Sequence, residues 1–182
     1  MDLAEGIVLS QYYKNQAHKR IGEPEAAAIF KQIVEALAYC HRTGVYHRDI
    51  KTENVLIDKY RRIKIIDFGF SVKSTPSTKL TLFCGTPNYM SPEIVLKKEY
   101  LGGPSDCWAL GVLLFVITAG YFPFKGKDDK ELHKKIINVQ LVFPPHASEN
   151  LKSLTTNILK VTPESRFTCD QILEHAWFKD YR

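Results

Sequence analysis

Four side chains between residues 49 and 67 have the types and the spacing that transfer of a phosphoryl group requires. Asp49 can orient an attacking hydroxyl group and accept its proton, and Lys51, two residues later, can hold the phosphate that is transferred. Asn54 and Asp67 lie on either side of a short apolar segment and can share a Mg²⁺ ion. Each residue taken alone could be a turn, cap or surface residue, but the four together predict a phosphoryl-transfer site.

Two short runs rich in β-branched residues must position the metal-binding pair. Residues 55–57 and 63–66 predict strands, and the polar residues 58–62 between them predict the turn of a hairpin. A hairpin would place Asn54 and Asp67 at adjacent strand ends, where two residues distant in sequence can share one ion.

Helical periodicity dominates the rest of the chain. Apolar residues recur at helical spacing after Pro24, a residue type favoured in a first turn, and Gly44 ends that pattern. Ser148 and Thr168 are plausible N-caps of two later helices. Helices are predicted at residues 9–15, 23–41, 128–138, 148–160 and 168–174.

The most apolar run, Cys107 to Phe122, predicts a buried helix. A membrane-spanning helix needs about 20 apolar residues, and this run is shorter and is interrupted by Gly111 and Gly120. A helix that is apolar on all sides and does not span a membrane lies in a protein core. We therefore expect no membrane partner.

Composition bounds the class of protein. With 182 residues, 45% of them hydrophobic, the chain has the size and core of a single globular domain. The formal net charge of +5 and the pI near 8.9 come from scattered Lys and Arg residues, so no nucleic-acid partner is expected. Cys40, Cys84, Cys107 and Cys169 show neither CxxC pairing nor a His at zinc-ligand spacing. They predict free thiols, and together with a start that lacks a signal peptide they predict an intracellular protein, cytoplasmic or nuclear.

Five motifs occur in the order in which eukaryotic protein kinases carry them. The catalytic-loop motif runs from His47 to Asn54, and an Asp-Phe-Gly motif begins at Asp67. Cys84 to Glu93 resembles the end of an activation segment, and Ser105 to Gly111 resembles the start of the family's central helix. Pro163 to Arg166 carries an Arg where the family has one. The chain therefore resembles a eukaryotic protein kinase.

The resemblance covers only the C-terminal lobe of the kinase domain. The N-terminal lobe of the family supplies a Gly-rich loop, a strand Lys and a helix Glu, and the sequence has none of these. The implied fold is mainly α with a few short β-strands, a protein-kinase-like C-terminal lobe with the N-terminal lobe absent. Residues 1–182 would be a partial protein kinase domain that starts near the hinge, with an activation segment at about 67–93.

The resemblance also implies roles in catalysis with ATP and Mg²⁺. Asp49 would be the base, Lys51 would hold the γ-phosphate, and Thr86 would hydrogen-bond both residues. Lys51 and Thr86 are typical of serine/threonine kinases rather than tyrosine kinases. Calcium/calmodulin-dependent and polo-like kinases are the most similar in appearance, because of the motif from Cys84 to Tyr89.

The same resemblance assigns the remaining ligands of the site. Asn54 and Asp67 would bind Mg²⁺. ATP would lie on Lys51 and on Leu56 as its floor, and would contact the hinge backbone, for which the candidates are Asp2 and Ala4.

Regulation is expected at Arg48, which could bind a phosphorylated activation segment through charge-assisted hydrogen bonds or could simply be a solvated cation. Leu82 occupies the usual position of the phosphorylated residue, so the neighbouring Thr81 is the expected phosphosite of an upstream kinase. His47 is expected to pack rather than to react.

Three further residues have expected structural roles. The resemblance implies a buried ion pair between Glu93 and Arg166, which would anchor the activation segment to the helical body. Asp106 would stand at the start of the central helix.

Two functions remain open from the sequence. The first is a protein serine/threonine kinase, of which this chain is the C-terminal lobe, with ATP and Ser/Thr-containing proteins as partners. The second is a naturally truncated, non-catalytic kinase lobe that acts as a protein-binding module.

Overall fold

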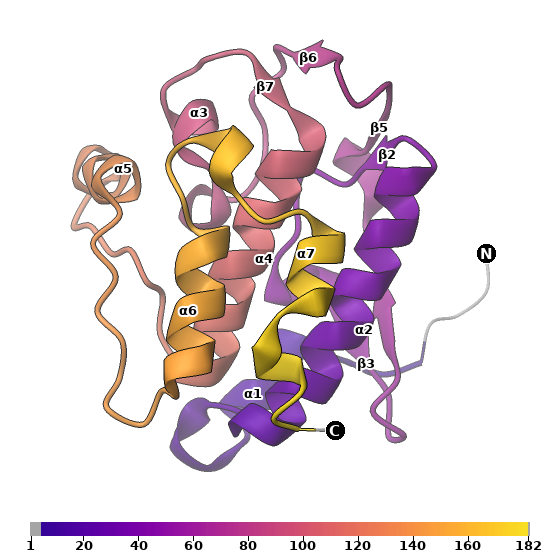
Figure 1. Cartoon of the computed structure of the whole chain (residues 1–182), viewed down its shortest axis with the longest axis vertical. Helices are drawn as coiled ribbons and strands as arrows, with labels where there is room; N and C mark the ends of the chain where they lie inside the picture. The colour runs from indigo at the N-terminus through magenta and orange to yellow at the C-terminus, as the bar shows by residue number, and fades with distance from the viewer. Residues whose placement is uncertain (1–4, 182) are drawn as a thin grey trace.

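A helix that is apolar on all sides forms the centre of the molecule. The structure is a computed structural model and describes residues 5–181. Helix α4 (Gly102–Ala119) is buried along almost its whole length, and the other helices surround it (Figure 1). Among the described residues, α4 alone has the length and apolarity of a membrane span, and 89% of it is buried inside the protein. It is therefore the core helix that the sequence predicts.

The bounds of α4 differ from the apolar run that predicts it, Cys107 to Phe122. The helix begins five residues earlier, because Pro104 is compatible with a first turn and the small residues before it fit against neighbouring segments. It ends at Ala119 because Gly120 adopts a left-handed conformation, with φ of 82°.

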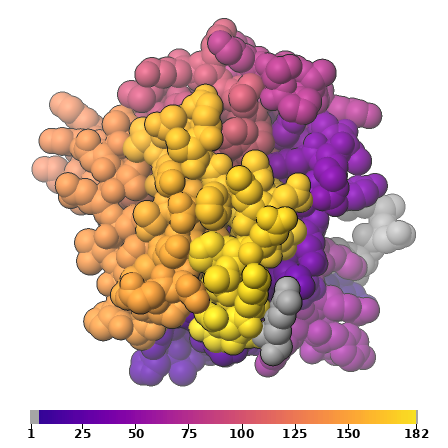
Figure 2. All heavy atoms as spheres, in the orientation of Figure 1, coloured from indigo at the N-terminus to yellow at the C-terminus, as the bar shows by residue number. Residues whose placement is uncertain are grey.

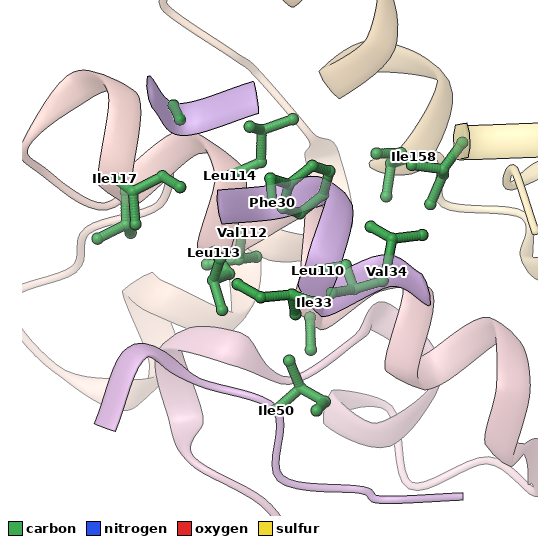
Figure 3. Packing of buried hydrophobic residues seen from close by; sticks show 14 of the residues in the cluster. Phe30, Ile33, Val34, Ile50, Leu110, Val112, Leu113, Leu114, Ile117 and Ile158 are labelled. Atoms are coloured by element: carbon green, nitrogen blue, oxygen red, sulfur yellow. The ribbon is translucent and has the colours of Figure 1, made fainter. Parts of the chain in front are cut away.

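Helix α2 (Glu23–Arg42) packs against α4 through one apolar face. Pro24 lies in its first turn, and the left-handed Gly44 follows its C-terminal cap. Figure 3 shows side chains of α2 and α4 meeting in the core, together with Ile50 and Ile158 from other segments. The helix agrees with the predicted range to within one residue.

The remaining helices are short and cover α4. Figure 1 shows α2 and α6 on opposite sides of α4, and Figure 2 shows the C-terminal part of the chain covering one face of the molecule. Ser148 and Thr168 are N-caps, as predicted, and accept hydrogen bonds from Leu151 N and Gln171 N. Helix α6 ends two residues before the predicted end because Leu159 leaves the helical conformation. The α-helices are α1 (Leu9–Lys14), α3 (Pro92–Val95), α5 (Asp129–Asn138), α6 (Glu149–Ile158) and α7 (Cys169–Glu174).

Short strands and 3₁₀ turns complete the fold. The expected hairpin is β3 (Val55–Ile57) with β4 (Ile63–Ile65), and β1 (Ile7–Val8) adds an antiparallel third strand beside β3. Two further antiparallel pairs have only two residues per strand, too few for sequence alternation to indicate them. These are β2 (Val45–Tyr46) with β5 (Val72–Lys73), and β6 (Lys79–Leu80) with β7 (Tyr100–Leu101). The 3₁₀ helices are Ala17–Lys19, Thr52–Asn54, Phe68–Phe70, Pro87–Tyr89, Pro163–Ser165 and Ala176–Phe178.

The first turn of α4 lies directly against β2, the strand that leads into residues 47–54. A Cβ atom added at Gly102 would lie 2.4 Å from Cγ and 2.6 Å from Cβ of Tyr46, which is closer than packed atoms approach. At the neighbouring Gly103 the nearest atom of Tyr46 would be 3.5 Å away, an ordinary contact. A methyl side chain would therefore fit at Gly103 but not at Gly102.

Gly102→Ala should destabilise the protein by about 1–3 kcal/mol, because a methyl group would be forced into the ring of Tyr46. Gly103→Ala is the matched control in the same turn, and it should leave stability unchanged or slightly raised. Urea unfolding of the three proteins measures the difference. Equal unfolding midpoints for the two variants would show that this contact does not constrain the fold.

Candidate active site

The buried carboxylate of Asp106 holds the loop that carries the candidate catalytic residues. Its Oδ2 atom accepts a hydrogen bond from the backbone N of His47 at 2.9 Å, and its Oδ1 atom accepts one from Arg48 N at 2.8 Å. The ring of His41, in the last turn of α2, also contacts Oδ2 through Nε2 at 2.9 Å. These bonds fix the backbone ahead of Asp49, where Arg48 has a left-handed φ of 66°.

His47 joins this loop to the segment that follows β4. The side chain is fully buried, and its Nε2 atom donates to the carbonyl of Ile66 at 3.0 Å while Nδ1 accepts from Asp49 N at 3.2 Å. Its ring also packs on Phe68, with centroids 4.7 Å apart. His47 thus has a structural role beside both the Asp49 loop and the Asp-Phe-Gly segment.

Asp49, Lys51 and Thr86 form a closed triangle of hydrogen bonds. Lys51 Nζ donates to Asp49 Oδ2 at 2.7 Å and to Thr86 Oγ1 at 2.9 Å. Thr86 Oγ1 in turn donates to Asp49 Oδ1 at 2.9 Å. Thr86, which is more than 30 residues away in the sequence, thus holds the buried carboxylate of Asp49 and the ammonium group of Lys51 in one arrangement.

Asn54 and Asp67 occupy neighbouring positions, as the hairpin requires. Asn54 donates through Nδ2 to the carbonyl and to Oδ2 of Asp49, at 2.9 and 3.2 Å, so its Oδ1 atom is the one that could bind a cation. The backbone N of Ile66 donates to Asn54 O at 2.9 Å, which places the next residue, Asp67, beside the loop. Asp67 is exposed, has a left-handed φ of 62° and accepts from Gly69 N at 3.3 Å.

The predicted floor of the nucleotide site lies on the same sheet. Leu56 is half-buried on β3, between its antiparallel partners Val8 and Lys64. Asp2 and Ala4, the predicted hinge contacts, lie outside the described residues.

Arg166 and Glu93 form a buried bidentate ion pair. The NH1 and NH2 groups of Arg166 each donate to a different carboxylate oxygen of Glu93, both at 2.6 Å. The same guanidinium donates to three backbone carbonyls and lies 5.0 Å from the ring of Trp108 in α4. The end of the predicted activation segment is therefore attached to the helical core.

Arg48, the regulatory candidate, and Leu82, the residue after Thr81, both lie beside Tyr100. Arg48 is half-buried, and its Nε atom donates to the carbonyl of Phe70 at 2.6 Å. Thr81 is exposed and directly follows β6, and Tyr100 donates its hydroxyl to the carbonyl of Leu82 at 2.9 Å. Burial raises the pKa of Tyr100, and the nearby guanidinium of Arg48 opposes this shift.

Two residues near the site are not indicated by the sequence. The hydroxyl of Tyr89 contacts both the backbone N and Oγ1 of Thr52, at 3.4 and 3.1 Å, and so fixes the turn between Lys51 and Asn54. His41 reaches Asp106 from α2. Both contacts join residues more than 30 positions apart, and no periodicity or spacing rule could have found them.

Comparison with known proteins identifies the family. The model of the protein kinase domain matches residues 1–178. The chain belongs to the protein kinase family. Its curated relatives include the probable serine/threonine-protein kinase MARK-A of Dictyostelium discoideum, 45% identical over 161 residues, and CBL-interacting protein kinase 33 of rice (Oryza sativa subsp. japonica), 46% identical over 165 residues. The probable serine/threonine-protein kinase HSL1 of Saccharomyces cerevisiae is 43% identical over 182 residues.

These relatives confirm the expected likeness to eukaryotic serine/threonine protein kinases. The alignments cover 88%, 89% and 100% of this chain, but only 15%, 36% and 12% of MARK-A, the rice kinase and HSL1, respectively. This kinase chain thus spans well under half the length of the relatives that it matches. The finer likeness to calcium/calmodulin-dependent or polo-like kinases stays a prediction.

Arg166→Ala should lower the free energy of unfolding by about 3–5 kcal/mol, because it leaves the Glu93 carboxylate buried without its partner. The matched control is Arg42→Ala, which removes an exposed ion pair with Asp170 (N–O distance 3.5 Å) and should cost no more than about 0.5 kcal/mol. Thermal and urea unfolding measure both. If the two variants lost equal stability, the buried pair would not be the anchor of the activation segment.

Proposed function

We propose that this chain is the C-terminal lobe of a protein serine/threonine kinase and transfers the γ-phosphate of ATP to protein hydroxyls when a strand-rich lobe completes the site. The observation that carries the proposal is the hydrogen-bonded triangle of Asp49, Lys51 and Thr86. A purely structural role would not require the carboxylate of Asp49 and the ammonium group of Lys51 to be held together with Asn54 beside them.

The triangle supports a division of labour among its three members. Asp49 would accept a hydrogen bond from the substrate hydroxyl, orient it and take up its proton. Lys51 would move from Asp49 toward the transferring phosphate and balance its charge. Thr86 would keep the carboxylate and the ammonium group in position, which matters because positioning supplies most of the catalysis in phosphoryl transfer.

The donor set beside the triangle suits Mg²⁺. Asn54 offers an amide oxygen and Asp67 offers a carboxylate. Mg²⁺ prefers oxygen ligands, and it needs only one or two from the protein when phosphates and water supply the others. When bound, the ion would neutralise charge on the phosphates. These two residues would hold it between the catalytic loop and the Asp-Phe-Gly segment.

Apolar surface next to the site supports the presence of a second lobe in the active enzyme. Phe68 and Phe70 are 40% and 47% exposed, and Ile7 on the edge strand is 41% exposed. A covering lobe would bury these side chains and enclose ATP above Leu56, with the hinge backbone at Asp2 and Ala4 as part of the same proposal.

Regulation and location complete the proposal. An upstream kinase would phosphorylate Thr81, and Arg48 would bind the phosphate after releasing the carbonyl of Phe70. Mass spectrometry of the protein from its native cells tests this choice, and phosphate confined to residues 74–78 would contradict it.

An intracellular setting, cytoplasmic or nuclear, is proposed from the four free cysteines.

Fusion of this chain to the strand-rich lobe of one of its kinase relatives tests the function. The fusion protein should phosphorylate Ser/Thr peptides with ATP, and Asp49→Asn should lower kcat by about 100-fold or more, since it removes the base. The matched control is Asp129→Asn, which replaces an exposed carboxylate on α5 and should retain full activity.

Two results would contradict the proposal. A folded fusion protein without activity would favour the alternative, a non-catalytic lobe that binds proteins. Robust peptide phosphorylation by residues 1–182 alone would show that the second lobe is dispensable. Isothermal titration should instead find that the isolated chain binds MgATP at least about tenfold more weakly than the fusion protein, because most contacts to the nucleotide are missing.

A further inference from the structure

Three side chains that commonly bind soft metal ions converge from three different helices. His41 lies near the end of α2, Cys107 lies in α4, and Cys169 is the first residue of α7. One nitrogen and two sulfur atoms of these residues all lie within 4.8 Å of one another. The sulfur atoms are 3.9 Å apart, and His41 Nδ1 is 3.7 Å from the sulfur of Cys169.

Two of the three separations match edges of a zinc coordination tetrahedron, and the third, between the His41 nitrogen and the sulfur of Cys107, is at most 4.8 Å. With Zn–S bonds near 2.3 Å and Zn–N bonds near 2.0–2.1 Å, tetrahedral geometry sets the S–S distance at ~3.8 Å and the S–N distance at ~3.6 Å. The observed separations of 3.9 and 3.7 Å differ from these values by about a tenth of an ångström.

The orientation of the His41 ring favours the same conclusion. Its Nε2 atom lies 2.9 Å from Oδ2 of Asp106, and an ionised carboxylate can only accept, so Nε2 carries the proton. In the neutral ring, Nδ1 then presents a lone pair toward the sulfur atom of Cys169, 3.7 Å away. A histidine that donates its other nitrogen to a carboxylate is the usual arrangement around a bound zinc ion.

The cavity beside the three residues and the charge of their side chains are also suitable for a zinc ion. A cavity of about 200 Å³ is lined by all three residues together with Phe167 and Thr168, and it gives an ion and a water molecule a way in. Two thiolates and a neutral imidazole bring Zn²⁺ to a net charge of zero, so the complex can be buried without a further counter-ion. With three protein ligands, water would fill the fourth position.

Oxidation chemistry explains the cluster less well. A disulfide between Cys107 and Cys169 would use both sulfur atoms but would leave the His41 nitrogen beside them without a role. Cys107 and Cys169 are only 3% and 4% exposed, so a bulky oxidant would reach their sulfur atoms less readily than a metal ion in the adjoining cavity. Zn²⁺ binding would release one proton from each thiol to the solvent, so the affinity for the ion should increase with pH.

We propose that His41, Cys107 and Cys169 bind one Zn²⁺ ion that ties α2, α4 and α7 together. The site is separate from the oxygen-donor pair assigned to Mg²⁺, and it does not depend on the proposed kinase activity. Because His41 also contacts Asp106, a bound ion would restrict the motion of the carboxylate that holds the predicted catalytic loop.

Metal titration of the reduced, metal-free chain of 182 residues tests the site. Zn²⁺ should bind with a stoichiometry of one, and Co²⁺ as a spectroscopic probe should give a thiolate-to-metal charge-transfer band and the intense visible bands of a tetrahedral site. Cys107→Ser and Cys169→Ser should each weaken Zn²⁺ binding by about 100-fold or more, since a first ligand matters at least as much as the outer contacts that cost 10- to 100-fold. Cys40→Ser and Cys84→Ser remove the other two cysteines as matched controls and should bind normally.

Thermal unfolding with and without Zn²⁺ provides an independent readout. The melting temperature of the unmodified chain and of the two controls should rise with Zn²⁺, and that of the two site variants should not. Circular dichroism of the metal-free proteins checks folding, and Cys169→Ala replaces any serine variant that fails to fold. The proposal is overturned if the folded chain binds no stoichiometric Zn²⁺, or if the site variants bind it as tightly as the controls.

Discussion

The carboxylate of Asp106 is the constraint on which the candidate active site of this kinase chain depends. An anion buried inside a protein is tolerated only when hydrogen bonds replace its hydration. Here the replacement comes from the backbone of the catalytic loop, through His47 N and Arg48 N, and from the ring of His41. If the loop moved away from α4, the buried carboxylate of Asp106 would lose its backbone hydrogen bonds. These bonds therefore fix the position of the backbone just before Asp49.

A second buried charge attaches the activation segment to the same part of α4. Arg166 holds Glu93 with two hydrogen bonds, and it also donates to the carbonyl of Pro104 and lies against Trp108. Such a pair adds little net stability compared with an apolar core, but it is costly to break, so it specifies one arrangement. The first two turns of α4 thus determine the positions of both segments that form the candidate active site.

The sequence predicted those parts of the site that depend on local order. The spacing of Asn54 and Asp67 around two β-branched runs predicted their hairpin, and polar N-caps such as Ser148 marked helix starts correctly. Contacts between distant segments could not be predicted in this way. His41 with Asp106, and Cys107 with Cys169, are joined only by the packing of α2, α4 and α7, and neither periodicity nor motif spacing encodes that packing. Strands of two residues are likewise too short to show alternation.

Amide hydrogen exchange in the Asp106→Asn variant tests the central claim most directly. An asparagine has the shape of the aspartate, but its Nδ2 group donates and cannot accept, so one of the two loop amides loses its partner. We predict that exchange at His47 or Arg48 becomes about tenfold faster or more, as expected for the loss of one charge-assisted hydrogen bond, while amides in the middle of α4 stay protected. Unchanged exchange at both loop amides in a folded variant would contradict the account.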